Sequence, residues 1–97
     1  MKKLLRQLTE TFGPSGYEDT VRAIVRAEVE PLADEVRVDA LGSVIARKKP
    51  SAPNGDTKKI MIAAHMDEIG LIVSHVDEKG FVRFSPIGSV FRRYVLG

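Results

Sequence analysis

The chain has 97 residues, of which 43% are hydrophobic and 29% charged, and its net charge is +2. This length allows one small domain with a modest core, and the composition is ordinary for a globular protein. The weak charge argues against a nucleic-acid partner. The basic residues at 47–49 and 58–59 form short runs beside prolines and a glycine, which is typical of a solvated loop.

Cysteine is absent, so neither a disulfide nor a thiolate ligand or nucleophile is available. No window approaches the roughly 20 apolar residues that span a bilayer. Arg6, Gln7 and Glu10 interrupt the apolar segment at the N-terminus before it could serve as a signal peptide. These features predict a cytoplasmic protein with no membrane partner.

Two helices are predicted first. Residues 2–12 carry apolar side chains at helical spacing with charged residues between them. The glycines and proline of 13–16 end this helix, because glycine suits a helix C-terminus and proline cannot continue the hydrogen-bond ladder. Ser15 is the expected N-cap of a second helix that runs to about Glu30.

A hairpin is predicted next. Residues 35–39 alternate in polarity, and 44–47 return after a turn at 41–43. A polar loop over 48–57 follows. The uniformly apolar run at 60–64 then predicts a buried, central strand over about 58–64.

The character of the sequence changes after Gly70. Strands are predicted at 71–76 and 81–84 around a tight turn at 77–80, and another turn is predicted at 86–88. The predicted fold class is α/β followed by an all-β segment, with a boundary near 68–70. Both parts look unfinished, so we expect a fragment of a larger protein.

The sharpest candidates for chemistry are His65 and Asp67, which follow directly after the apolar run. Ligand sites of α/β proteins lie at the carboxyl ends of sheet strands. A histidine there can bind a metal through one ring nitrogen while a carboxylate orients the ring. Alternatively, His65 is a polar strand-end residue and Asp67 a turn former. Glu68 could approach the site or face solvent, and His75 is expected to be structural.

Other reaction classes find less support. The serines lie in no nucleophile elbow, and 13–16 lacks the lysine of a phosphate-binding loop. A dinuclear metal site needs a bridging carboxylate, further ligands and a general base. This chain does not plainly supply that set.

Four ordered stretches, at 8–18, 38–44, 63–70 and 80–88, follow a known family pattern. They include the sequences FGPSGYE, VDALGSV, AAHMDEIG and GFVRFSPIG. In these residues the chain resembles the N-terminal part of the glutamyl aminopeptidase and tetrahedral (TET) aminopeptidase family, whose members are often labelled endoglucanase or cellulase.

The resemblance implies the start of a zinc-peptidase α/β/α domain over 1–68. The first strands of an inserted β-barrel-like dimerisation domain would follow over 69–97. It further implies removal of N-terminal residues from peptides by two divalent metal ions, Zn or Co, commonly in a dodecameric homo-oligomer. By position, His65 matches a metal ligand and Asp67 the catalytic-site acid that supports this histidine. The other ligands would lie downstream.

The main hypothesis is therefore part of a metal-dependent aminopeptidase that is inactive, and binds no metal stably, as the isolated chain. A non-catalytic oligomerisation or interaction module is the alternative, because an incomplete β segment over 71–96 would present unpaired strand edges. A glycoside hydrolase rests on the family label alone. No carboxylate pair about 5–10 Å apart can be assigned for its acid and base work.

Overall fold

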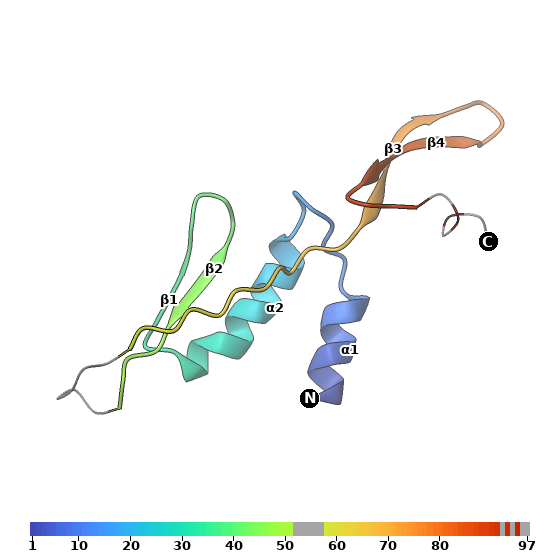
Figure 1. Cartoon of the computed structure of the whole chain (residues 1–97). Coiled ribbons are helices and arrows are strands. Elements are labelled where there is room, and N and C mark those ends of the chain that lie inside the picture. Colours follow the sequence, from blue (N-terminus) through green and yellow to red (C-terminus); the bar gives the residue numbers. More distant parts are fainter. Residues whose placement is uncertain (52–57, 92, 94, 96–97) are drawn as a thin grey trace.

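The structure is a computed structural model that describes residues 1–51, 58–91, 93 and 95. The helices come first along the chain and the strands follow (Figure 1), which confirms the predicted mixture of both. In chain order the elements are α1 (Lys2–Glu10), α2 (Asp19–Val29), the 3-10 helix η1 (Glu30–Leu32), β1 (Glu35–Val38), β2 (Val44–Arg47), β3 (Gly70–Val76) and β4 (Val82–Ile87).

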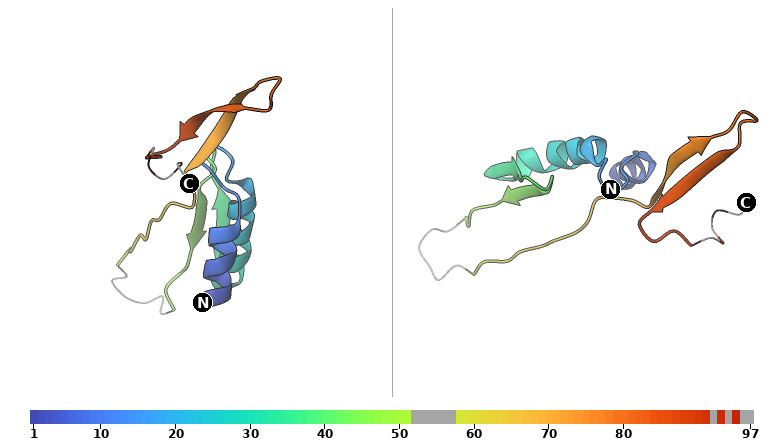
Figure 2. Two further views of the ribbon diagram at one scale, coloured as in Figure 1. Left: turned by 90° about the vertical axis from the view of Figure 1, so that its right-hand side faces the viewer. Right: turned by 90° about the horizontal axis from the view of Figure 1, so that it is seen from above.

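The described chain is elongated rather than compact. Its radius of gyration is 18.8 Å and its extents are 69 × 30 × 22 Å. A compact domain of similar length has a radius of gyration of about 13 Å. The two hairpins lie toward opposite ends, with β1–β2 beside α2 and β3–β4 projecting beyond the helices (Figures 1 and 2).

The helices form where the sequence predicts them, with differences at their ends. The first ends at Glu10, and the second begins at Asp19 after the N-cap residue Glu18. The prediction that Ser15 caps this helix was wrong, because Ser15 lies too far ahead of the first helical amides to reach them. The Ser15 hydroxyl donates to the Asp67 carboxylate instead. Within the described residues, no helix is both long and apolar enough to cross a membrane.

The predicted β1–β2 hairpin is confirmed. Its strands are antiparallel, with Val36 opposite Ala46. The Asp39 carboxylate accepts hydrogen bonds from the amides of Leu41 and Ser43, both at 2.9 Å. Gly42 has a φ of 87°, the left-handed region that glycine adopts without strain. The turn is therefore encoded locally.

The predicted β3–β4 hairpin is also confirmed, with Val76 opposite Val82 and Asp77 closing the turn. The second strand continues to Ile87, so the prediction of a turn over 86–88 was wrong at its first two residues. Pro86 is tolerated there because β4 pairs only with β3 among the described residues, and an edge strand accommodates a proline. The turn begins at Gly88, whose φ is 75°.

The predicted strand over 58–64 is not formed. This segment is extended, but no described strand pairs with it, because the two sheets contain only β1–β2 and β3–β4. Ile60, Met61 and Ile62 are 87%, 89% and 92% exposed. The apolar run led to the prediction of a buried strand. A β-strand, however, also needs a second strand to pair with its backbone groups, and the described residues provide none here. Of the predicted loop, 52–57 lie outside the described residues.

Burial is concentrated where the 13–16 turn meets α2. Gly13, Pro14 and Val21 are the buried residues of the described chain, and Val21 is 3% exposed. A Cβ on Gly13 would lie 2.8 Å from Val21 Cγ1, so the contact requires glycine. One on Gly70 would lie 3.0 Å from Pro14 Cβ. This small core adjoins the residues that carry the candidate chemistry.

Candidate functional site

The candidate site forms where residues 13–16 meet residues 65–68, which we call the junction. Pro14 and Glu68 form an isolated parallel bridge. The Glu68 amide donates to the Gly13 carbonyl, and the Gly13 amide donates to Glu68 Oε1, both at 3.0 Å. The sequence left the role of Glu68 open. Its carboxylate and backbone both fasten the extended segment to the 13–16 turn.

His65 and Asp67 lie together at the junction. His65 Nδ1 is 3.0 Å from both Asp67 Oδ1 and the Asp67 carbonyl oxygen. An ionised carboxylate and a carbonyl are acceptors only, so in the neutral imidazole Nδ1 carries the proton and Nε2 keeps its lone pair. The His65 side chain is 85% exposed, which leaves Nε2 accessible.

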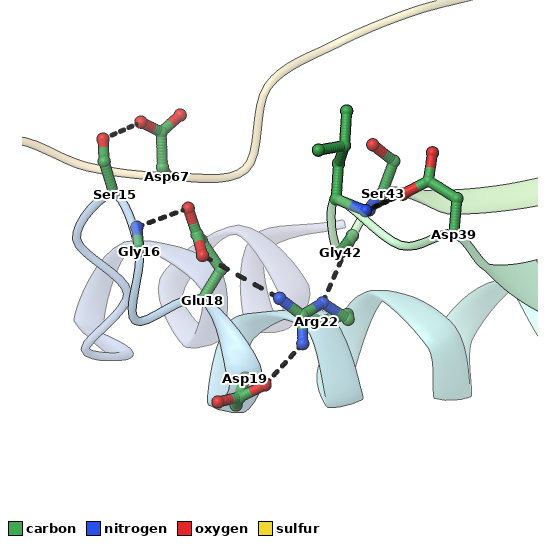
Figure 3. Close-up of polar contacts among 10 residues, drawn as sticks. Ser15, Gly16, Glu18, Asp19, Arg22, Asp39, Gly42, Ser43 and Asp67 are labelled. Carbon is green, nitrogen blue, oxygen red and sulfur yellow. Dashed lines mark hydrogen bonds and ion pairs between the residues drawn. The ribbon is translucent and has the colours of Figure 1, made fainter.

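Asp67 divides its two carboxylate oxygens between two partners. Its Oδ1 faces His65, whereas its Oδ2 accepts a hydrogen bond from the Ser15 hydroxyl (Figure 3). The Ser15 hydrogen bond, followed by that from His65, lowers the pKa of Asp67 below its ordinary value. Asp67 is therefore ionised at neutral pH and acts as an acceptor for both neighbours.

Sequence reasoning missed Ser15 as a site residue. Ser15 and Asp67 are separated by 52 positions in the chain, so no local pattern links them. Both lie, however, within the motif stretches FGPSGYE and AAHMDEIG, which carry the family resemblance. The presence of Ser15 and Asp67 in two such stretches was the signal that could have identified Ser15 as a site residue.

Arg22 ties α2 to the β1–β2 turn next to the junction. Its Nε donates to the Gly42 carbonyl at 2.7 Å, and its guanidinium also contacts the carboxylates of Asp19 and Glu18 (Figure 3). The Arg22 side chain is only 20% exposed. Glu18 in turn accepts a hydrogen bond from the Gly16 amide at 2.8 Å. These contacts connect the hairpin, the helix and the 13–16 turn.

A groove of about 370 Å³ opens beside His65. Arg22 and Val25 line it from α2, Leu41 lines it from the β1–β2 turn, and His65 and Asp67 line it from the extended segment. The groove therefore places the charged side chain of Arg22 and the apolar side chains of Val25 and Leu41 next to the exposed imidazole.

The donors at this site fit part of a metal centre. A histidine whose Nδ1–H is held by a carboxylate is the usual form of a metal-binding imidazole. Across 1–51 and 58–91, however, no three His, Cys, Asp or Glu side chains converge on one point. His75 lies on β3 opposite Arg83, in the other hairpin. A dinuclear centre needs more donors than His65 and Asp67 provide.

Comparison with known proteins gives consistent matches. The model of the M42 glutamyl aminopeptidase family matches residues 42–97. The lysyl aminopeptidase of Pyrococcus furiosus is 47% identical over 89 residues, which cover 91% of this chain and 24% of that protein.

Two solved structures are also similar. A TET aminopeptidase from a marine sediment archaeon of the Thaumarchaeota is 41% identical with a TM-score of 0.82, over 95% of this chain and 25% of its own. A Thermotoga maritima protein described as an endoglucanase is 38% identical with a TM-score of 0.79, over 92% and 28%. The chain thus spans about a quarter of the length of these proteins.

Proposed function

Because this chain belongs to the M42 glutamyl aminopeptidase family, we propose that it forms part of a metal-dependent aminopeptidase that removes N-terminal residues from peptides. The family match confirms the resemblance predicted from the sequence. Its relatives include proteins named for aminopeptidase activity. The observation that carries the proposal is the His65–Asp67 pair, with Nδ1 held and Nε2 exposed.

The proposed roles follow from this geometry. His65 binds a divalent metal ion through Nε2, and Asp67 holds the imidazole in the required tautomer and orientation. Bound Zn or Co ions supply a Lewis acid for the scissile carbonyl and lower the pKa of a water molecule. The remaining ligands and the general base come from residues outside 1–97. The isolated chain is accordingly expected to be inactive and to hold no metal stably.

We also propose that the chain belongs to two domains. Residues 1–68 form the N-terminal part of an α/β/α catalytic domain, and 69–97 begin a β-barrel-like dimerisation domain. The separate position of β3–β4 supports this division (Figure 1). We further propose a homo-oligomer, dodecameric as the family resemblance implies. The absence of cysteine supports a cytoplasmic location.

Peptidase assays test the proposal. By full-length protein we mean residues 1–97 joined to the further sequence that brings the chain to the length of its relatives. We expect it to release N-terminal residues from peptides, and we expect a chelator to abolish this activity. His65→Ala should lower kcat/KM by about 100-fold or more, whereas the control His75→Ala should change it by less than about twofold.

Two results would contradict the proposal. One is peptidase activity that persists in the chelator, and the other is a His65→Ala variant with unchanged kcat/KM. Turnover by the isolated chain, free of any longer protein, would refute its expected inactivity.

An interaction module is the second candidate, favoured by the exposed apolar side chains of the β3–β4 hairpin. Val73, Phe81 and Phe84 are 57%, 71% and 45% exposed. Such a surface invites a partner. Light scattering of the isolated chain tests this candidate, because a monomer at all concentrations would argue against it.

A glycoside hydrolase is supported only by the names of similar structures, one described as an endoglucanase and another with both peptidase and endoglucanase in its description. Asp67 and Glu68 are adjacent in the chain, and both carboxylates are held by residues of the 13–16 turn. They do not form a pair that could flank a glycosidic bond.

A further inference from the structure

We propose that Ser15 is a positioning residue of this site: by holding one carboxylate oxygen of Asp67, it fixes the other oxygen against His65 Nδ1 and so presents Nε2 for metal binding. The metal-binding part of this inference rests on the proposed function. The effect of Ser15 on the imidazole does not, because it follows from contacts within this chain.

The Ser15 hydroxyl restricts rotation of the Asp67 carboxylate. The terminal torsion of an aspartate is broad and roughly two-fold, so a carboxylate without a fixed partner turns easily. The Asp67 side chain is 36% exposed, so water can compete for its oxygens. The hydrogen bond from Ser15 to Oδ2 removes this freedom and leaves Oδ1 directed at His65 Nδ1.

Ser15 is itself held in place. The Tyr17 amide donates to the Pro14 carbonyl at 2.8 Å, which closes a turn around Ser15. Gly16 has a φ of 88°, and its amide donates to Glu18 Oε1. On the other side, the Pro14–Glu68 bridge fixes the turn to the extended segment. These contacts fix the position of the Ser15 hydroxyl relative to Asp67.

The Ser15 hydroxyl does not also cap a helix. The second helix begins at Asp19, and its N-cap is Glu18. Since Ser15 stands before this cap, its hydroxyl is available to Asp67. Three residues therefore form a relay of hydrogen bonds from Ser15 through Asp67 to His65.

The test uses the tautomer of His65 in the metal-free isolated chain. The chain contains only His65 and His75, so nitrogen NMR distinguishes the two imidazoles. At about pH 8 a histidine is neutral, and in water the Nε2–H tautomer predominates. We expect His65 to be mainly the Nδ1–H tautomer in the wild-type chain. His75 serves as the internal reference.

Matched substitutions isolate the hydroxyl. Threonine and valine have nearly the same shape, and only threonine keeps the donor. Ser15→Thr should keep the Nδ1–H tautomer of His65. Ser15→Val and Ser15→Ala should shift it part of the way toward Nε2–H, because the Asp67 carbonyl remains as an acceptor for Nδ1. Ser74→Ala is the control, because Ser74 donates to a backbone carbonyl of the β3–β4 hairpin, away from the junction. It should leave His65 unchanged.

Several results would overturn the proposal. These are a wild-type His65 that is mainly Nε2–H, or equal tautomer ratios in the threonine and valine variants. Loss of fold in all Ser15 variants would also overturn it, because Ser15 would then support the fold and not the ring.

Zinc binding by the full-length protein separates this inference from the proposed function. We expect Ser15→Val to weaken zinc binding by about 10- to 100-fold relative to Ser15→Thr, and to lower kcat with little change in KM. If the tautomer shifts as expected but the full-length protein neither binds zinc nor cleaves peptides, the proposed function fails while the positioning of His65 stands. If the full-length protein is active but the tautomer is insensitive to Ser15, the inference fails alone.

Discussion

The contact between Gly13 and Val21 gives the sharpest stability prediction, because it joins the small core to the junction. In Gly13→Ala the new Cβ would lie 2.8 Å from Val21 Cγ1 and 3.2 Å from Val21 Cβ. Val21 cannot give way easily, since a β-branched side chain has one strongly preferred rotamer in a helix. Val21 is also only 3% exposed.

Two effects of this substitution oppose each other. Replacing a glycine at a compatible backbone conformation stabilises a protein by about 0.4–1 kcal/mol through the unfolded state. Overpacking costs about 1–3 kcal/mol. Overpacking is the larger effect, so we expect Gly13→Ala to destabilise the fold by about 1–2 kcal/mol. This corresponds to roughly 5- to 30-fold less protection of the backbone amides against hydrogen exchange.

Amide hydrogen exchange in the isolated chain measures this effect. The amides of α2 report on the core, and the Glu68 amide, which donates to the Gly13 carbonyl, reports on the junction. Both should lose protection in Gly13→Ala. The amides of Lys79 and Phe81, which donate to the Asp77 carboxylate within the β3–β4 turn, serve as the reference and should exchange as before.

The double variant tests the cause. Val21→Ala alone should cost about 1.6 kcal/mol, because it removes two buried carbons at about 0.8 kcal/mol each. It also removes Cγ1, the atom nearest to the new methyl group. Gly13→Ala should then cost less in the Val21→Ala background than in the wild type. Equal costs in both backgrounds, or increased protection in Gly13→Ala alone, would refute the reasoning.

Three further predictions concern the hairpin, the helix and the extended segment. Hydrogen bonds from the amides of the β1–β2 turn, that of Ser43 foremost, lower the pKa of Asp39 from its ordinary 3.8. The ionised Asp39 therefore stabilises the turn fully above pH 3.8, and this contribution is lost as the pH falls through the lowered pKa. A titration of Asp39 followed by amide chemical shifts would contradict this if its midpoint lay at or above 3.8. Arg22→Ala should cost about 1.5–3 kcal/mol by hydrogen exchange in β1–β2, because it leaves a carbonyl of the turn without its charged donor; the control Arg6→Ala removes an exposed ion pair and should cost less than about 0.5 kcal/mol. Ile62 is 92% exposed. We expect its amide to exchange without protection in the isolated chain and slowly in the full-length protein. Protection in the isolated chain would contradict the unpaired state of this segment.

Elements that depend on local contacts were predictable from the sequence. Asp39 and Gly42 define one hairpin, and Asp77 and Gly80 define the other, through hydrogen bonds and backbone angles within a few residues. Alternating polarity then predicted β1 and β4. The end of β4 was misplaced because Pro86 is a turn signal that an edge strand can absorb.

Elements that depend on distant partners were not predictable. The run at 58–64 has the pattern of a buried strand, but pairing is a property of two segments, and the described residues offer it no second one. Ser15 was assigned to a helix cap, the nearest role that its local sequence permits. Its actual partner, Asp67, lies far along the chain. His65 and Asp67 were found because the residues that touch each other are also neighbours in sequence.

Zinc titration of the full-length protein tests the central claim, that His65 is a metal ligand held by Asp67. We predict that the wild type and His75→Ala bind zinc alike, and that His65→Ala binds it at least about 100-fold more weakly. Asp67→Asn should lie between them, because the ring keeps its metal-binding nitrogen but loses its charged support. Equal zinc affinity in the wild type and His65→Ala would contradict the account.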